Sequence, residues 1–123
     1  MIEQKVTKLN RYFDAQIALC EKRNQDLLAD ERGDEATFEK VKANVYDIFR
    51  TVLFVADKTS KGDPEAVRLF FIEKTQQIPS NWKAAYEKAK LHEDTIKMQI
   101  EQIKLDTINE IREQFLKIWE GTE

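Results

Sequence analysis

Residues 81–119 read NWKAAYEKAKLHEDTIKMQIEQIKLDTINEIREQFLKIW, a stretch that contains neither glycine nor proline. Its apolar residues recur mostly at steps of three or four, the spacing that keeps side chains on one face of an α-helix. The pattern therefore predicts a single long helix over residues 81–119. The apolar face consists of Trp82, Ala85, Ala89, Ile96, Ile100, Ile103, Thr107, Ile111, Phe115 and Ile118.

Three more helices are predicted upstream of this one, over residues 2–31, 35–59 and 64–78. Gly33 stands where the first of them should end, because glycine takes the left-handed backbone conformation without steric cost. Pro79 disfavours helical geometry in the residue before it, which should end the third helix. The loops between these helices are short, so helices that follow each other along the chain are expected to be antiparallel neighbours.

The predicted fold is an all-α, antiparallel four-helix bundle with a short third helix and a long C-terminal helix, in one domain over residues 1–123. Only three glycines and two prolines are present, which is too few for the frequent turns of a β-rich fold. At 1.5 Å per residue the helices measure roughly 45, 38, 22 and 60 Å, so their lengths do not match. The third helix can pack along the bundle or across its end, and either way the last helix extends past its neighbours.

The charge of the chain is mixed, with 20 basic and 23 acidic residues and a net charge of −3. A nucleic-acid-binding protein usually carries a basic stripe, and the sequence offers none, so no nucleic-acid partner is expected. The longest apolar runs fall far short of the roughly 20 residues of a membrane span, so no membrane partner is expected. The lone Cys20 lies among apolar positions of the first helix and is predicted to be a core residue. A single cysteine favours a cytoplasmic location.

No catalytic, cofactor-binding or metal-binding residues are predicted. The chain has one histidine, His92, and Ala89 stands where the glutamate of a di-iron Glu-x-x-His unit would be. A zinc site would have only His92 and Cys20 as nitrogen and sulfur ligands, too few without carboxylates. The three glycines are far apart, so no phosphate-binding loop can form. The sequence therefore predicts a protein that is not an enzyme and needs no cofactor.

A second apolar line on the long C-terminal helix predicts an interface with another protein. Leu91, Met98 and Leu105 lie seven residues apart, on the side opposite the main apolar face. Exposed apolar patches usually mark an interaction site. The end of the helix adds aromatic and aliphatic residues, which become contact anchors if the helix extends past the bundle and otherwise pin it to the core. The candidate interface residues are Leu91, Met98, Leu105, Phe115, Ile118 and Trp119.

The leading hypothesis is therefore a non-enzymatic interaction module that forms a homodimer or binds another protein through its C-terminal helix. A related hypothesis is an acidic inhibitor or immunity-type protein, whose binding to a basic target would be sensitive to salt. A separate alternative is a bundle that responds to a small molecule held in a polar core pocket. Its candidate lining residues are Gln16, Asn24, His92 and Gln99.

Overall fold

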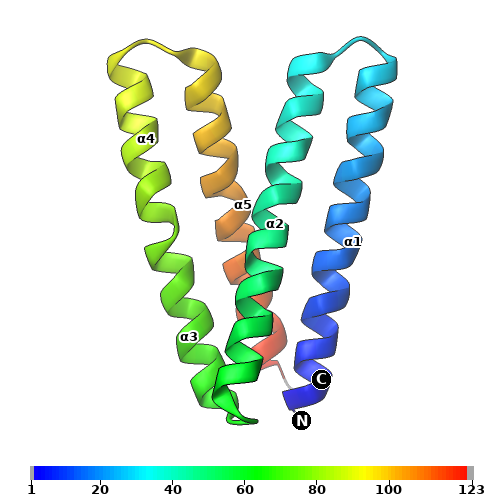
Figure 1. The fold of residues 1–123 in the computed structure, drawn as a ribbon, viewed down its shortest axis with the longest axis vertical. Helices are drawn as coiled ribbons and strands as arrows, with labels where there is room; N and C mark the ends of the chain where they lie inside the picture. The colour runs from blue at the N-terminus through cyan, green and yellow to red at the C-terminus, as the bar shows by residue number, and fades with distance from the viewer. Residues whose placement is uncertain (1, 122–123) are drawn as a thin grey trace.

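The computed structural model describes residues 2–121, and within them the chain is helical apart from short turns. The helical segments are α1 (Ile2–Ala29), α2 (Gly33–Ser60), α3 (Pro64–Gln77), α4 (Pro79–Leu91) and α5 (Thr95–Glu120). Because α3 and α4 follow each other as one bent helix, the segments make up a four-helix bundle (Figure 1). The predicted all-α bundle is confirmed, including a long C-terminal helix, α5, of 26 residues. The third helix is short only as far as α3 reaches, because it continues through Pro79 into α4.

Pro79 bends the third helix instead of ending it. The backbone of Ile78 keeps helical dihedral angles, φ −61° and ψ −44°, so α4 begins directly after α3. Proline lacks the amide hydrogen that the helical ladder needs at this point, and its ring clashes with the preceding turn, which is the usual origin of a kink. The two segments therefore keep one general direction and cross the length of the bundle together, as Figure 1 shows.

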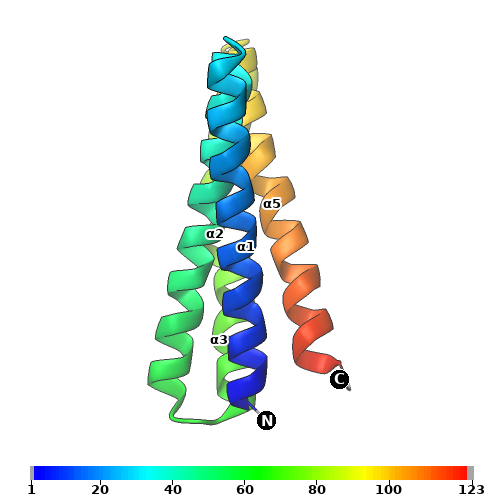
Figure 2. The ribbon, with the colours of Figure 1, turned by 90° about the vertical axis from the view of Figure 1, so that its right-hand side faces the viewer.

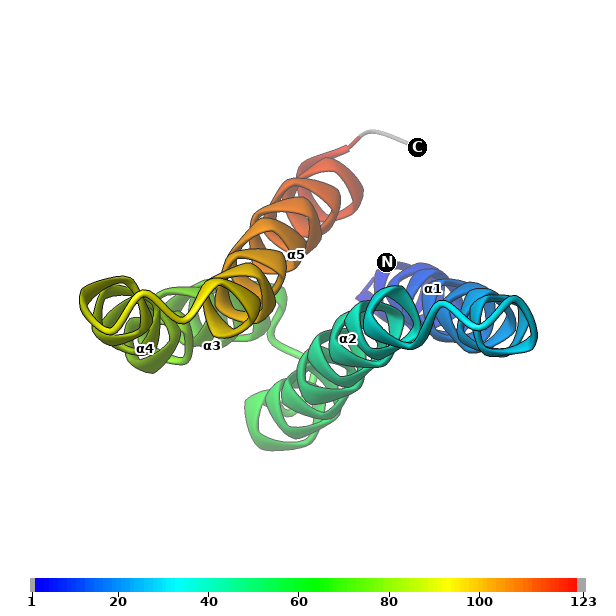
Figure 3. The ribbon, with the colours of Figure 1, turned by 90° about the horizontal axis from the view of Figure 1, so that it is seen from above.

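The predicted single helix over residues 81–119 is wrong, because the chain reverses direction at residues 92–94. The helix divides there into α4 and α5, which lie side by side as antiparallel neighbours (Figures 1 and 3). The predicted extension of one 60 Å helix past its neighbours is therefore absent. No glycine or proline marks this reversal, and the helical spacing of apolar residues continues across it, so the sequence predicted one uninterrupted helix.

Backbone hydrogen bonds and a side-chain cap form the reversal. Glu93 takes the left-handed conformation with φ +55°, and its amide donates to the Lys90 carbonyl at 3.2 Å. The Asp94 amide donates to the Ala89 carbonyl at 2.9 Å, which completes a Schellman-type helix end. The Asp94 carboxylate then accepts from the Lys97 amide at 3.1 Å and caps α5. The same aspartate thus closes one helix and starts the next.

The turn between α1 and α2 uses the same geometry. Glu31 takes the left-handed conformation with φ +58°, and the Arg32 amide donates to the Leu27 carbonyl at 2.8 Å. Gly33 is already the first residue of α2, so the prediction that Gly33 terminates the first helix is wrong. In both turns a glutamate takes the strained position that glycine usually fills.

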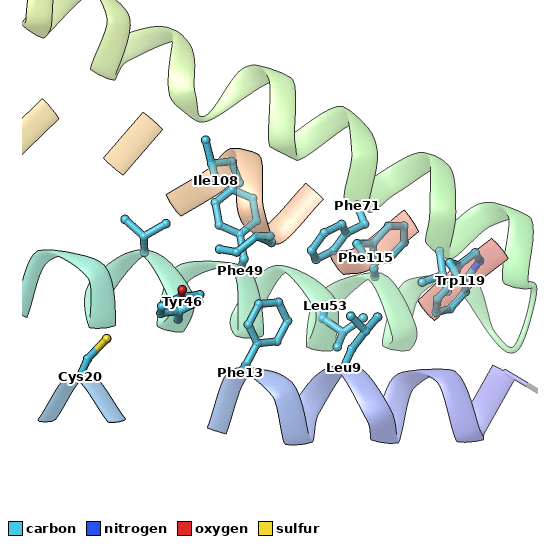
Figure 4. Packing of buried hydrophobic residues seen from close by; sticks show 14 residues of the cluster. Leu9, Phe13, Cys20, Tyr46, Phe49, Leu53, Phe71, Ile108, Phe115 and Trp119 are labelled. Atoms are coloured by element: carbon cyan, nitrogen blue, oxygen red, sulfur yellow. The ribbon is translucent and has the colours of Figure 1, made fainter. Parts of the chain in front are cut away.

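The core is centred on Phe71 of α3, which contacts one aromatic ring from each of α1, α2 and α5. The ring centroids lie 6.5 Å from Phe13, 5.9 Å from Phe49 and 4.2 Å from Phe115, and the last pair is stacked. Trp119 continues the stack beyond Phe115 at 5.2 Å. Figure 4 shows these rings between the helices. All four phenylalanines are fully buried, so this cluster holds the four helices together.

The helices diverge away from this core. We refer to α1 and α2 as the first hairpin, and to α4 and α5 as the second hairpin. Figure 1 shows the two hairpins close together at the lower end and apart at their tips, and Figure 3 shows the separated tips from above. Figure 2 shows α5 inclined to the other helices. The accessible surface is 7883 Å², whereas a compact monomer of this mass exposes about 6,900 Å².

Replacing Phe71 with alanine should lower the free energy of unfolding by about 3–5 kcal/mol, because it leaves a cavity where four helices meet. Urea denaturation followed by circular dichroism measures this change. Phe54 is a matched control, since it is 61% exposed on α2. Phe54→Ala should change stability by about 0.5 kcal/mol or less. Similar losses in the two variants would contradict the central position of Phe71.

Candidate interaction surface

The first candidate surface is an apolar strip on α2, which we call the α2 strip and define as Phe38, Val41 and Ile48. Phe38 lies eleven residues before Phe49, so both side chains share one face of the helix. At Phe49 this face packs against Phe71 of α3. Nearer the tip the face loses its cover: Phe38 and Val41 are half-buried, and Ile48 at its edge is 39% exposed. This face of α2 is thus only partly covered by the chain itself.

The second candidate surface is the α5 strip, defined as Ile96, Ile100 and Ile103. Ile96 and Ile103 precede Glu110 by fourteen and seven residues, so they lie on the same side of α5 as this glutamate. Glu110 bonds to the first hairpin, and this side of α5 therefore faces that hairpin. Ile96 is 47% exposed, and the other two isoleucines are half-buried. The two strips together form the inner faces of the diverging hairpins.

A polar cluster joins the hairpins below the inner faces. The Tyr46 hydroxyl donates to Glu110 Oε2 at 3.0 Å, and the Tyr12 hydroxyl donates to Glu110 Oε1 at 3.2 Å. The tyrosine rings meet edge-on with centroids 6.1 Å apart. We call Tyr12, Tyr46 and Glu110 the tyrosine clamp, because a single carboxylate of α5 ties α1 and α2 in place. The clamp and the aromatic core below it limit how far the hairpins diverge.

The clamp changes the acidity of its two phenols. Burial raises the pKa of Tyr12 and of Tyr46 well above the ordinary tyrosine value, and the charge of Glu110 raises both further. Ionised phenolates would face this carboxylate in a poorly hydrated position, which disfavours the loss of either proton. The hydroxyl groups therefore remain hydrogen-bond donors to Glu110 throughout the neutral pH range.

The tips of the two hairpins carry opposite charge. Residues 26–35 contain five carboxylates and one arginine, whereas residues 83–97 contain four lysines and three carboxylates. Each tip also presents a leucine, since Leu28 is 53% exposed and Leu91 is 83% exposed. Within residues 2–121 several charges at the tips form no ion pair, namely Glu31, Asp34, Lys83, Lys88, Lys90 and Lys97.

The predicted interface residues at the end of the C-terminal helix lie mainly in the core. Phe115 is 0% exposed and Trp119 is 4% exposed, and both belong to the aromatic stack. Ile118 is half-buried and borders a groove between α1 and α5. Of the two alternatives for Phe115 and Trp119, the one in which they pin the helix end to the core is therefore confirmed, because the chain reversal at residues 92–94 places the end of α5 against its own bundle.

The second apolar line is divided between the surface and the interior of the second hairpin. Leu91 is exposed near the tip. Met98 and Leu105 are half-buried, and each lines a groove that residues of α3 or α4 share. The prediction of a continuous exposed line through these three residues is wrong, because α4 folds back along the side of α5 that carries Met98 and Leu105.

The four residues predicted to line a polar pocket are not brought together. Gln16 and Asn24 lie on α1 and are half-buried, and the Asn24 amide group donates to the Ala36 carbonyl at 2.8 Å. His92 is exposed in the turn of the second hairpin, and Gln99 is exposed on α5. The expectation that His92 borders the core is wrong, because the reversal that begins at this residue directs it to the surface.

Cys20 is a core residue, as its position in the apolar pattern predicts. It is 3% exposed, and burial raises the pKa of its thiol. It borders a groove of about 330 Å³ between α1 and α2, which also contains Glu39. This buried carboxylate is paired with Lys42 at 3.3 Å and with Arg23 at 3.7 Å. Local ion pairs therefore satisfy this buried carboxylate beside the thiol.

Comparisons with protein-family models, with curated proteins and with solved structures find no match for this chain. In the described part of the chain, no helix has the length and apolar character needed to cross a membrane. Among the same residues, histidine, cysteine, aspartate and glutamate side chains do not gather in threes as a metal site requires. The geometry of the surface is therefore the main guide to function.

Sequence reasoning missed the inner faces and the tyrosine clamp. The helical spacing placed Ile96, Ile100 and Ile103 on the main apolar face of the last predicted helix, which should be covered by the core. A signal for the clamp was present in the spacing of Ile96, Ile103 and Glu110, which places a carboxylate in line with apolar residues. Periodicity alone does not tell which part of a stripe a neighbouring helix covers.

The tyrosine clamp predicts that stability falls at alkaline pH. In the unfolded chain tyrosines lose their protons near pH 10, whereas the raised pKa values keep Tyr12 and Tyr46 protonated in the folded protein. The two tyrosines therefore contribute their full stabilisation to the folded protein below about pH 10, and this stabilisation is lost as the pH rises above that value. Urea denaturation at a series of pH values should show a smaller alkaline loss for Tyr12→Phe/Tyr46→Phe than for the wild type. Tyr46→Phe alone should be intermediate, and identical pH profiles for all three proteins would refute the clamp.

Proposed function

We propose that the protein is a non-enzymatic, cytoplasmic interaction module that binds a protein between its two hairpins. The observation that carries this proposal is the incomplete cover of the two inner faces. The α2 strip and the α5 strip face each other's hairpin, yet Ile48 and Ile96 remain 39% and 47% exposed. A bundle with no further role would gain stability by closing the hairpins on these side chains, since burying apolar surface lowers the free energy.

The arrangement of charge supports binding over catalysis. The buried carboxylates Glu39 and Glu101 are each held by a lysine one helical turn away, at 3.3 Å and 3.0 Å. The tyrosine clamp likewise pairs each donor with an acceptor. Each of these groups therefore has a charged or polar partner nearby, although Glu101 Oε2 itself accepts no hydrogen bond within residues 2–121. The lone buried thiol of Cys20 supports the proposed location, because proteins of the reducing cytoplasm keep free cysteines.

The module presents two kinds of surface to a partner. The inner faces offer aliphatic and aromatic side chains, which supply most of the binding energy in protein interfaces. The charged tips lie beside the inner faces and set the orientation of the partner, because the two hairpins carry opposite charges and favour only one direction of binding. In this proposal α5 provides one of the two contact faces, so the C-terminal helix keeps the role that the sequence predicts, through different residues.

Site-specific photo-cross-linking tests this proposal. A p-benzoyl-phenylalanine is introduced in place of Val41 or of Ile96, and cells that naturally carry the gene are irradiated. A protein adduct of defined mass is expected from both positions, because both side chains lie on the inner faces. Mass spectrometry then identifies the attached chain.

Leu69 of α3 provides the matched control for this experiment. It is 57% exposed, more than either test position, and lies two residues after the buried Val67, on the outer side of its helix. Cross-linking at Leu69 should yield little or no adduct. Equal adducts from all three positions, or none from Val41 and Ile96, would show that the inner faces do not bind a protein.

A further inference from the structure

We propose that the partner held between the hairpins is a second copy of this chain, paired about a two-fold axis that runs parallel to the hairpins. This inference rests on the proposed function and adds the identity of the partner. In such a pair the first hairpin of each copy lies against the second hairpin of the other. The α2 strip and the α5 strip of both copies then surround the axis.

The exposed area agrees with an interface of ordinary size. The chain exposes 7883 Å², about 1,000 Å² more than the scaling law gives for a compact monomer of 14.5 kDa. A stable protein–protein interface removes about 800 Å² from each partner. A second copy on the inner faces would therefore return the surface of each chain to the ordinary range, which a short peptide between the hairpins would do only in part.

The opposite charges of the tips favour a second copy over an unrelated chain. A two-fold axis along the hairpins places the acidic residues 26–35 of one copy beside the lysine-bearing residues 83–97 of the other, and this contact occurs twice. The exposed Leu28 and Leu91 lie at the same two tips, so an apolar contact accompanies each charged one. Glu31, Lys90 and Lys97 form no ion pair within residues 2–121, and their charges are available for the pairing. One chain thus contains both halves of a complementary surface.

The first measurement is the mass of the wild-type chain by light scattering and sedimentation equilibrium, from micromolar to millimolar concentration. The expected result is an association that approaches twice the 14.5 kDa of one chain. Ile96→Asp should weaken this association about tenfold or more, because it places a charge in the proposed interface. Leu69→Asp is the matched control and should leave the dissociation constant unchanged.

Charge reversal at the tips tests the two-fold arrangement itself. Asp30→Lys/Glu31→Lys/Asp34→Lys changes the net charge of residues 26–35 from −4 to +2, and Lys90→Glu/Lys97→Glu changes that of residues 83–97 from +1 to −3. Each variant alone presents tips of one sign and should dimerise about tenfold more weakly than the wild type. An equimolar mixture of the two variants restores both opposite-charge contacts and should form a heterodimer about as tight as the wild-type pair. Circular dichroism melting curves confirm that both variants remain folded.

A wild-type chain that keeps the mass of a monomer at millimolar concentration would overturn the second-copy proposal. A mixture of the two variants that forms no heterodimer would overturn it as well. X-ray scattering of a monomer with its hairpins closed together would show that the inner faces cover each other. These failures remain distinct from failure of the proposed function: cross-links from Val41 and Ile96 to a different protein would keep the interaction module and exclude the homodimer.

Discussion

The stacking of Phe71 against Phe115, at 4.2 Å between ring centroids, is the contact on which the rest of the structure depends. Phe71 also contacts Phe13 and Phe49, so a single ring joins α3 to each of the other three long helices. Because these contacts lie at one end, they fix the helices there and leave the hairpins to diverge toward their tips. The tyrosine clamp adds one more connection between the hairpins above this core.

This one-ended packing explains why apolar residues with the same spacing have different surroundings. Ile111 and Thr107 lie near the closed end and are buried, whereas Ile96 lies on the same face of α5 and is 47% exposed. The apolar spacing continues along α5 toward the tip, but the first hairpin diverges from α5 there and no longer covers these residues. An incompletely covered apolar surface therefore arises from the angle between two hairpins, with no special motif in the sequence.

The polar residues at the helix contacts have structural roles that follow from the same geometry. Glu110 reaches two tyrosines of the first hairpin, and Glu39 and Glu101 are each paired with a lysine one turn along their own helix. The contacts of Glu110, and the pair of Glu39 with Arg23, join different helices and help to set their register, whereas the lysine pairs lie within one helix and only satisfy a buried charge.

The sequence alone determined the all-α class, the four-helix bundle, the limits of α1 and α2, the start of α3 and the end of α5, because apolar spacing and capping residues act within a few turns of the chain. Asp63 and Pro64 start α3 as predicted, and Cys20 lies in the core as its position on an apolar stripe indicates. Only the tertiary structure decided where the chain reverses within the last predicted helix. Glu93 and Asp94 form this turn, and the sequence there lacks the glycine that usually marks such a position. The tertiary structure also decided which apolar residues are covered: Met98 and Leu105 gain cover from α4, while Phe38 and Ile96 lose it. Whether an apolar residue of a helical stripe is buried depends on where the neighbouring helix lies and at what angle it approaches. The spacing of residues along one helix gives no information about either.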